Sequence, residues 1–183
     1  MNDDLEQLLR NLRLKTVAAR FDEYLAAAEQ DGTPVSTLLT QLLRAEWQGQ
    51  QDAALEARMQ RAKLPERWTL ESFPFKVQTG VNQRQIRSFA ALEFIPKAEN
   101  IVFVGETGVG KTGLASALVV KAVQNGYRAL FVSAQTLFDT MYASLADRST
   151  RKLLNTLVKV DLLCVDEFGY MNTLLSKLAA ERR

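Results

Sequence analysis

The sequence contains no histidine and a single cysteine, Cys164. One cysteine cannot form a disulfide within the chain, and without histidine there is no zinc site of the Cys/His type. Histidine is also the commonest general acid and base in enzymes, so any proton transfer must use Asp, Glu, Lys or Tyr. These shortages exclude disulfide-stapled folds, zinc fingers and histidine-based hydrolases. Cys164 lies in an apolar run and is interpreted as a core side chain rather than a reactive thiol.

The sequence also lacks long apolar segments. Its longest apolar runs include residues 114–120 and 162–165, which are far shorter than a segment that crosses a bilayer. The chain begins with Asp3, Asp4 and Glu6, whereas a signal peptide begins with basic residues and an apolar stretch. We therefore expect a cytoplasmic protein with no membrane partner.

Charge is unevenly distributed, although the net charge of the chain is only +2. Residues 1–75 carry a net charge of −3, and residues 76–183 carry +5. A mildly basic second half is compatible with contacts to a nucleic-acid backbone, and equally with an ordinary solvated surface. The candidates for such phosphate contacts are two groups of basic side chains: Arg84 and Arg87, and Arg148, Arg151 and Lys152.

Apolar periodicity divides the chain into three segments. Residues 1–65 show helical spacing, with a break at residues 31–34 and an end at Pro65, and are predicted to form a small helical module. Residues 66–99 are rich in large apolar side chains and are predicted to be a connector that docks on the rest of the protein. Residues 100–183 are predicted to form the core of the protein.

The third segment has the pattern of an α/β protein with a parallel sheet. Short β-branched and aromatic runs alternate with apolar stretches of helical length. The expected strands are residues 101–104, 128–133 and 161–166, and the expected helices are residues 111–125, 135–145 and 153–159. The first strand is expected to be buried, and it leads directly into the most informative motif of the sequence.

That motif is the run Gly105-Glu106-Thr107-Gly108-Val109-Gly110-Lys111-Thr112, followed by Gly113. It matches the phosphate-binding loop, or Walker A pattern, and it lies between a predicted strand and a predicted helix. Glycines allow a tight turn that directs N–H groups at phosphates, and the helix N-terminus attracts negative charge. Lys111 can reach the β- and γ-phosphates, and the Thr112 hydroxyl suits Mg²⁺. We predict that residues 105–113 bind ATP with Mg²⁺.

A second motif is the apolar run 162–165 followed by Asp166 and Glu167, the pattern of a Walker B strand. Ligands of open α/β sheets bind at the carboxyl ends of the strands, which places both carboxylates near the phosphate loop. Asp166 is predicted to hold Mg²⁺ together with Thr112. The predicted catalytic residues are Glu167, which would activate the attacking water, and Lys111.

Several stretches of the chain then resemble one known family. They are residues 14–18 (LKTVA), Phe21, 68–73 (WTLESF), 99–105 (ENIVFVG) and 161–170 (DLLCVDEFGY). These stretches resemble the IstB-like helper ATPases of bacterial insertion sequences, which are AAA+ proteins related to helicase loaders of the DnaC type. The resemblance implies a P-loop AAA+ sheet behind a helical module. It also implies ATP-dependent self-assembly on double-stranded DNA and stimulation of a partner transposase.

The resemblance is expected to end at Tyr170. It implies that this chain lacks two further strands, a polar sensor residue and an arginine that reaches the neighbouring subunit's nucleotide. Residues 101–104 would then have no neighbouring strands, and an apolar surface would be exposed. We therefore expect a truncated copy of marginal stability that binds nucleotide and hydrolyses little of it. In related proteins the connector often contributes to the adenine pocket, which makes Phe75 and Ile86 candidates.

Other functions remain compatible with the sequence. A helicase-loader-like ATPase would share every motif, and a nucleotide or small-molecule kinase would share the phosphate loop without needing the acidic pair. A non-catalytic module would bind a transposase or another copy through residues 1–65. There Leu38, Leu42 and Trp47 form an apolar stripe that is either internal core or a partner surface.

Overall fold

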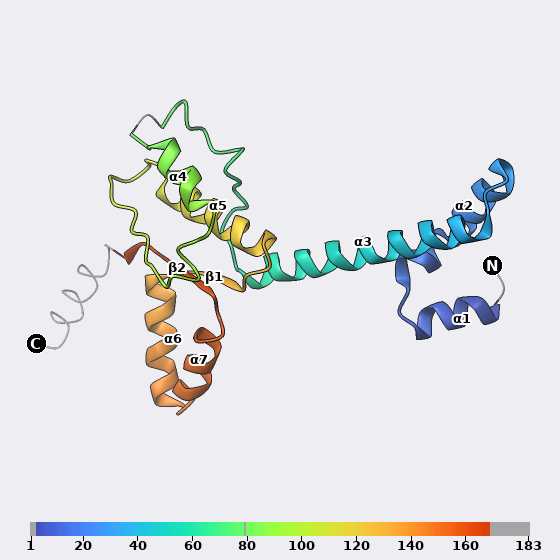
Figure 1. Ribbon diagram of the computed structural model, residues 1–183. Helices are drawn as coiled ribbons and strands as arrows, with labels where there is room; N and C mark the ends of the chain where they lie inside the picture. The colour runs from blue at the N-terminus through green and yellow to red at the C-terminus, as the bar shows by residue number, and fades with distance from the viewer. Residues whose placement is uncertain (1–2, 79, 169–183) are drawn as a thin grey trace, which may run out of the picture. The chain divides into compact units, whose positions relative to one another are not determined.

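The computed structural model describes residues 3–78 and 80–168, so Tyr170 and the segment after it lie outside the described residues. The chain forms two compact units, Met1–Glu56 and Ala57–Arg183, and the division falls within a helix. In chain order the elements are α1 (Asp3–Asn11), α2 (Lys15–Asp31), α3 (Val35–Arg61), α4 (Gln83–Phe89), α5 (Lys111–Gln124), β1 (Ala129–Ser133), α6 (Ala134–Ala146), α7 (Thr150–Leu157) and β2 (Leu162–Asp166) (Figure 1). No described helix is long and apolar enough to span a membrane. The predicted segment boundaries at residues 65 and 99 stay predictions.

The first unit is built on apolar side chains that its three helices share. Leu9 of α1, Val17 of α2 and Leu42 of α3 are buried together, with Leu38 packed against them. Leu38 and Leu42 therefore belong to the internal core, whereas Trp47 is 61% exposed. The predicted apolar stripe of α3 therefore lies partly in the core and partly on the surface.

A buried carboxylate joins α2 to α3. Glu46 accepts hydrogen bonds from the backbone N–H groups of Thr16 (2.8 Å) and Val17 (3.0 Å) and from the side chain of Gln50 (3.1 Å). Helix α2 has no side-chain cap next to it in sequence, so Glu46 supplies one from α3. Burial raises the pKa of Glu46, but the hydrogen bonds outweigh burial and the pKa lies below its ordinary value. Gly49 allows the close approach, since a Cβ there would collide with the Thr16 hydroxyl.

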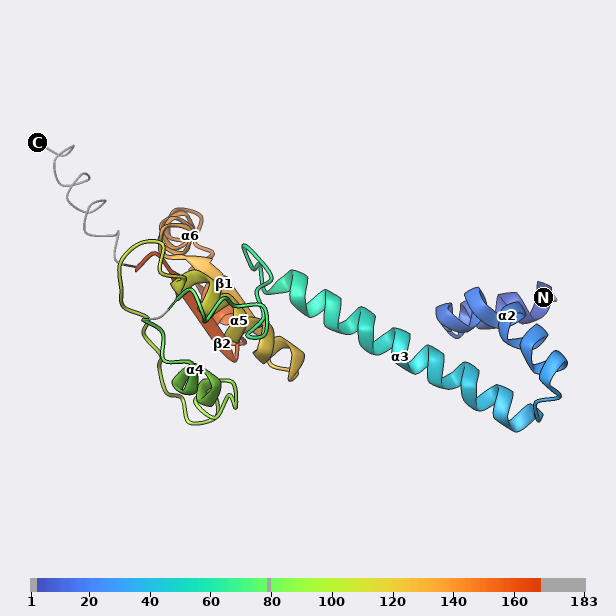
Figure 2. The same cartoon turned by 90° about the horizontal axis from the view of Figure 1, so that it is seen from above.

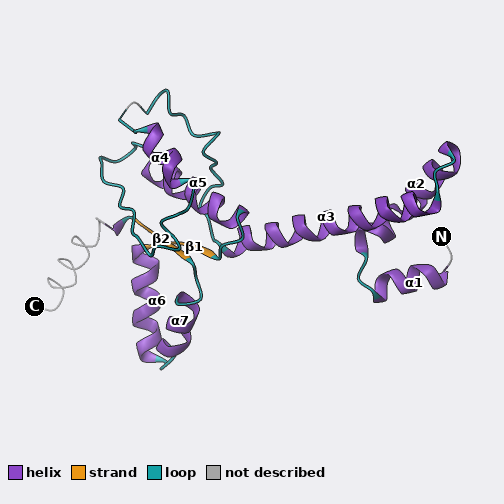
Figure 3. Ribbon diagram, viewed as in Figure 1, coloured by secondary structure: helices purple, strands orange, loops and turns teal. Residues whose placement is uncertain are grey.

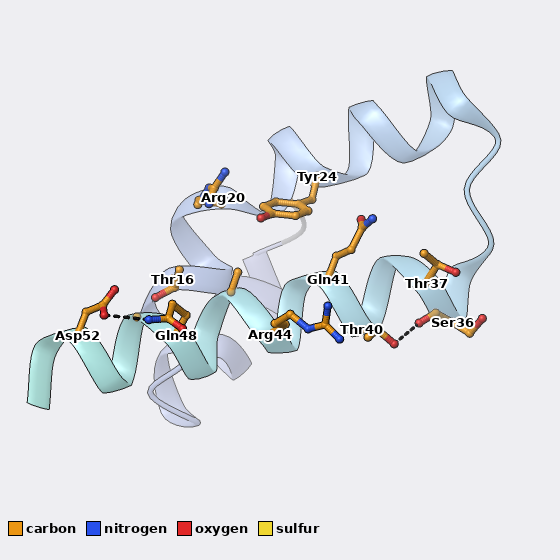
Figure 4. A pocket seen from close by; sticks show the side chains of 12 residues that line it. Thr16, Arg20, Tyr24, Ser36, Thr37, Thr40, Gln41, Arg44, Gln48 and Asp52 are labelled. Carbon is orange, nitrogen blue, oxygen red and sulfur yellow. Dashed lines mark hydrogen bonds between the residues drawn. The ribbon is translucent and has the colours of Figure 1, made fainter. Parts of the chain in front are cut away.

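A polar groove of about 910 Å³ lies between α2 and α3 (Figure 4). The Arg20 guanidinium lies 4.8 Å from the centre of the Tyr24 ring and pairs with Glu23. On α3, the Gln48 side chain donates to Asp52, and the Thr40 hydroxyl donates to the Ser36 carbonyl. Two of the lining side chains, those of Gln48 and Thr40, therefore have hydrogen-bond partners within the groove.

The second unit contains a parallel pair of strands covered by helices. β1 and β2 pair in register from Ala129 opposite Leu162 to Ser133 opposite Asp166. Helix α5 contacts both strands, and α6 contacts β1 and α7. Figure 1 shows α5 on one side of the strands and α6 with α7 on the other, and Figure 2 gives the view from above. This arrangement confirms the predicted α/β class with a parallel sheet.

The prediction of a buried strand at residues 101–104 is wrong. Within the described part of the chain the segment pairs with no strand, and Figure 3 draws it as loop. Val102 and Val104 are 78% and 91% exposed, whereas Ile101 and Phe103 are half-buried. Side-chain exposure alternates along the segment as it would in a strand, but a strand is stable only when neighbours satisfy its backbone N–H and C=O groups. Here β1 and β2 pair with each other and not with this segment.

Residues 66–99 pack aromatic side chains against α5. Phe73, Ile86 of α4 and Leu114 of α5 form a buried cluster. Trp68 and Phe75 both meet the Phe73 ring edge-on, with ring centroids 6.3 and 4.9 Å away. Such aromatic pairs contribute beyond the area that they bury. Partly buried side chains complete the cluster: Leu70, Phe75, Val81, Phe89 and Phe103.

Candidate functional site

The loop of residues 105–112 leads from the unpaired segment into α5. Gly108 and Gly110 both have φ near 85°, in the left-handed region that favours glycine. Gly110 is the N-cap of α5, and no side chain caps this helix. The N–H groups of the first turn are therefore available to an anion, which the helix dipole also attracts.

The Lys111 ammonium lies against the loop that precedes it. Nζ donates to the carbonyl oxygens of Gly105 (2.8 Å) and Glu106 (2.6 Å). Two N–H donors of the Lys111 ammonium are therefore bonded to these carbonyls rather than to phosphate oxygens. A bound phosphate would compete for the same donors, and its negative charge makes it the stronger acceptor.

Thr112 and Asp166 come together although they lie far apart in sequence. The Thr112 hydroxyl donates to Oδ2 of Asp166 at 2.8 Å. Asp166 is the last residue of β2, and its Oδ1 accepts the N–H of Glu167 at 2.9 Å. The structure thus places both predicted Mg²⁺ ligands at the carboxyl end of the sheet beside the first turn of α5.

Glu167 follows Asp166 on an exposed turn. Its φ of 59° is left-handed, which is uncommon for a residue other than glycine and recurs at functional sites. Its carboxylate forms no hydrogen bond with another described residue. The loop and Asp166 are therefore brought together, whereas Glu167 lies next to them without a side-chain contact to the loop.

Cys164 lies in the middle of β2. Burial, with a smaller contribution from the Asp166 charge, raises the pKa of its thiol to about 12. The thiol is therefore neutral at physiological pH and unreactive as a nucleophile. Cys164 is half-buried, so its role as a core side chain stays an interpretation.

A cavity of about 970 Å³ lies beside the phosphate loop. Gly105 and Lys111 border it on the loop side, and α4 contributes Ile86 and Phe89. Phe75 is not part of the lining and meets the Phe73 ring edge-on instead. Amide side chains add hydrogen-bonding groups to the apolar lining: Gln78, Asn82 and Gln85. Charged side chains also line the cavity, namely Glu93, Lys97 and Glu99, so its lining is mixed rather than predominantly apolar.

The basic side chains proposed as phosphate contacts are exposed. Arg84 and Arg87 lie on α4, Arg148 precedes α7 with a φ of 60°, and Arg151 and Lys152 lie on α7. They form two separate groups along the chain.

Two residues beside the loop and one beside Asp166 lie outside both nucleotide motifs. Phe73 and Gln78 lie beside Gly110, where a Cβ would be 2.9 Å from Cζ of Phe73 and 3.9 Å from Cδ of Gln78. Ser133 is paired in register with Asp166, and its hydroxyl caps α6 by accepting the N–H of Thr136. The sequence signals for Phe73 are the aromatic group around Pro74 and its place in the stretch 68–73 that resembles the family, and neither identifies its packing partner.

Comparison with known proteins identifies relatives that align with nearly the whole chain. An ATP-binding protein of insertion sequence IS21 from Pseudomonas aeruginosa is 34% identical over 168 residues, which are 92% of this chain and 63% of that protein. One of insertion sequence IS5376 from Geobacillus stearothermophilus is 32% identical over 171 residues, covering 93% of this chain and 68% of that protein. An IS21-like relative from Bacteroides fragilis is 31% identical, and the match covers 82% of it.

The family model described as IstB-like ATP binding protein matches residues 7–181. The match continues beyond Tyr170, so the expectation that the resemblance ends there is wrong. With a family match across nearly its full length and two relatives above 30% identity for which it covers more than two thirds, the chain belongs to the family of IstB-like ATP-binding proteins.

Proposed function

We propose that this chain binds ATP with Mg²⁺ and acts as the ATP-binding helper of an insertion-sequence transposase. The observation that carries the proposal is the Thr112–Asp166 hydrogen bond, because it joins the phosphate loop to the acidic end of β2. The relatives are named as ATP-binding proteins of insertion sequences, which supports both the ligand and the genetic setting.

In this proposal the loop binds the phosphates of the nucleotide, and the adjoining cavity binds its nucleoside. The uncapped first turn of α5 binds the phosphates, and Lys111 exchanges the carbonyls of Gly105 and Glu106 for the β- and γ-phosphates. The nucleoside enters the adjoining cavity, where Ile86 and Phe89 offer apolar contact to the base.

The residues present fit Mg²⁺. The Thr112 hydroxyl and the Asp166 carboxylate are hard oxygen ligands held 2.8 Å apart. Among the described residues no group of three or more acidic, cysteine or histidine side chains forms a metal cage, which suits a cation that is shared with substrate phosphates. Bound Mg²⁺ would neutralise charge on the β- and γ-phosphates.

Binding is tested by calorimetric titration of the 183-residue chain with ATP in the presence and absence of Mg²⁺. Lys111→Ala should weaken affinity by about tenfold or more, because it removes a charge-assisted contact to phosphate. Lys121→Ala, near the other end of α5, is the matched control and should bind as the unmodified chain does. Equal affinity of the Lys111→Ala variant would contradict the proposal.

We further propose that hydrolysis by this chain alone is slow. Glu167 would activate the attacking water, but its carboxylate is exposed and forms no hydrogen bond with another described residue. The loop is also entered from a segment that pairs with no strand in the described part of the chain. If the chain hydrolyses ATP briskly and Glu167→Gln abolishes this activity, the proposal of slow turnover is refuted. The proposal that the chain binds nucleotide would still stand.

DNA is the second proposed ligand, bound through backbone phosphates. The exposed side chains of Arg148, Arg151 and Lys152 supply positive charge on and beside α7. Replacing all three with alanine should weaken duplex binding. The slope of the logarithm of the binding constant against the logarithm of salt concentration should become shallower by about one unit per lost contact. Binding that does not change with salt would exclude this electrostatic role.

The alternative of a protein-binding module is favoured by one observation. Val35, Leu39, Leu43 and Trp47 recur every fourth residue along α3 and are 53–73% exposed. A contiguous exposed apolar row marks interaction surfaces. Co-sedimentation with the transposase should be lost in the Leu43→Gln variant and kept in the Gln48→Ala variant. If both variants or neither variant lost it, the exposed apolar row would not be the contact surface.

A further inference from the structure

We propose that Phe73 is a positioning residue for the phosphate loop. Its ring supports the backbone at Gly110 and Gly113 and so holds the base of the loop in the conformation that binds phosphate. The inference rests on the proposed nucleotide binding and adds a residue that lies outside both nucleotide motifs.

Contacts at the loop glycines show where the loop is held. A Cβ at Gly110 would lie 2.9 and 3.1 Å from Cζ and Cε2 of Phe73, and one at Gly113 would lie 3.4 Å from Cε2. Apart from its chain neighbours, no described residue has an atom within 4 Å of such a Cβ at Gly108, and at Gly105 the only such described residue is Val109 of the loop itself. The tip of the loop is therefore open, whereas its base rests on the Phe73 ring.

The Phe73 ring is itself held in place. It is only 6% exposed and packs with Ile86 and Leu114. Trp68 and Phe75 meet it edge-on from either side of Pro74, and Trp68 Cδ1 also lies 3.7 Å from a Cβ at Gly113. A packed ring with few alternative positions is a suitable support, because it transmits contact without yielding.

The loop needs such a support. In this chain residues 101–104 form no strand pairing with described residues, so the entry to the loop is not fixed by a sheet. Left-handed conformations at Gly108 and Gly110 must nevertheless be maintained for the N–H groups to converge. Ordering a loop at the moment of binding costs affinity, and a preorganised loop avoids that cost.

The test compares two equivalent phenylalanines in the same unit. Phe73→Leu removes the edge of the ring that touches Gly110. Phe131→Leu, on β1, removes the same atoms from a side chain that is also 6% exposed and is not among the neighbours of the loop glycines. Both variants should lose thermal stability. Affinity for ATP with Mg²⁺ is then measured at a temperature where both variants are folded.

We expect Phe73→Leu to weaken ATP affinity by about tenfold and Phe131→Leu to leave it within about twofold, because only the first frees the loop base. Phe73→Met, which refills the space with a flexible side chain, should recover part of the loss. Equal affinities for the Phe73→Leu and Phe131→Leu variants would overturn the positioning role. If the unmodified chain fails to bind ATP, or binds it independently of Lys111, the proposed nucleotide binding itself fails.

Discussion

At the scale of single residues, the pair Arg128–Asp161 fastens the beginnings of the two strands. The Arg128 backbone N–H and its guanidinium Nε and Nη2 donate to the Asp161 carboxylate at 2.8, 3.1 and 2.8 Å. In return the Asp161 N–H donates to the Arg128 carbonyl at 2.8 Å. The hydrogen bonds from the Arg128 side chain and backbone lower the pKa of Asp161 from 3.8 to about 2.

This pair predicts an acid-dependent loss of stability. Because the folded-state pKa of Asp161 is lowered, its contribution is fully present above pH 3.8 and is lost as the pH falls towards about 2. Asp161→Asn should lower the free energy of unfolding at neutral pH by no more than about 1 kcal/mol, since the pair is partly solvated. Thermal unfolding from neutral pH to pH 2 should show the variant and the unmodified chain converging in acid. A difference that is the same at every pH would contradict the assignment.

At the scale of elements, the contact between α2 and α3 depends on Glu46. Its carboxylate reaches the first turn of α2, where a negative charge is favoured by the helix dipole and by N–H groups that lack other partners. The charge is buried, so it is tolerated only because hydrogen bonds satisfy it.

We therefore expect Glu46→Gln to destabilise the helical unit by about 1–2 kcal/mol, since it removes the charge and leaves N–H groups poorly satisfied. The lowered pKa of Glu46 means that this stabilisation is present above pH 4.5 and lost below it. Hydrogen exchange at the amides of Thr16 and Val17 reports the effect directly. Asp52→Asn, on the exposed side of α3, is the control and should leave this exchange unchanged. Unchanged protection in the Glu46→Gln variant would show that α2 does not need this cap.

The elements also show what the sequence could predict. The helices and strands from residue 111 onward lie close to their predicted ranges, because apolar periodicity and local caps such as Ser133 act within each segment. The meeting of Thr112 and Asp166 follows from the parallel topology, which gathers strand ends at one edge. The prediction of a strand at residues 101–104 was wrong because strand formation depends on neighbouring strands, which the sequence of the segment does not reveal. The contact of Phe73 with Gly110 could not be predicted either, because it depends on how the connector packs.

At the scale of the whole molecule, stability and solubility depend most on apolar residues 101–104, whose backbone pairs with no described strand. Val102 and Val104 project into solvent from a segment with the alternation of a strand. Strand β2 pairs with β1 on one side and, within the described residues, with no strand on the other. A free strand edge and an exposed apolar segment can pair between copies.

Self-association at high protein concentration is therefore the expected behaviour of this chain. Replacing both Val102 and Val104 with threonine should reduce it while changing the free energy of unfolding by less than about 0.5 kcal/mol for each substitution, because exposed side chains contribute little to stability. Light scattering across a concentration series measures the first effect and denaturant unfolding the second. Val77→Thr, at an equally exposed position in the connector, controls for the loss of a surface valine. If the unmodified chain stays monomeric and unfolds reversibly in one cooperative transition, the unpaired segment does not cause association, and residues 101–104 are stable as the loop that the structure shows.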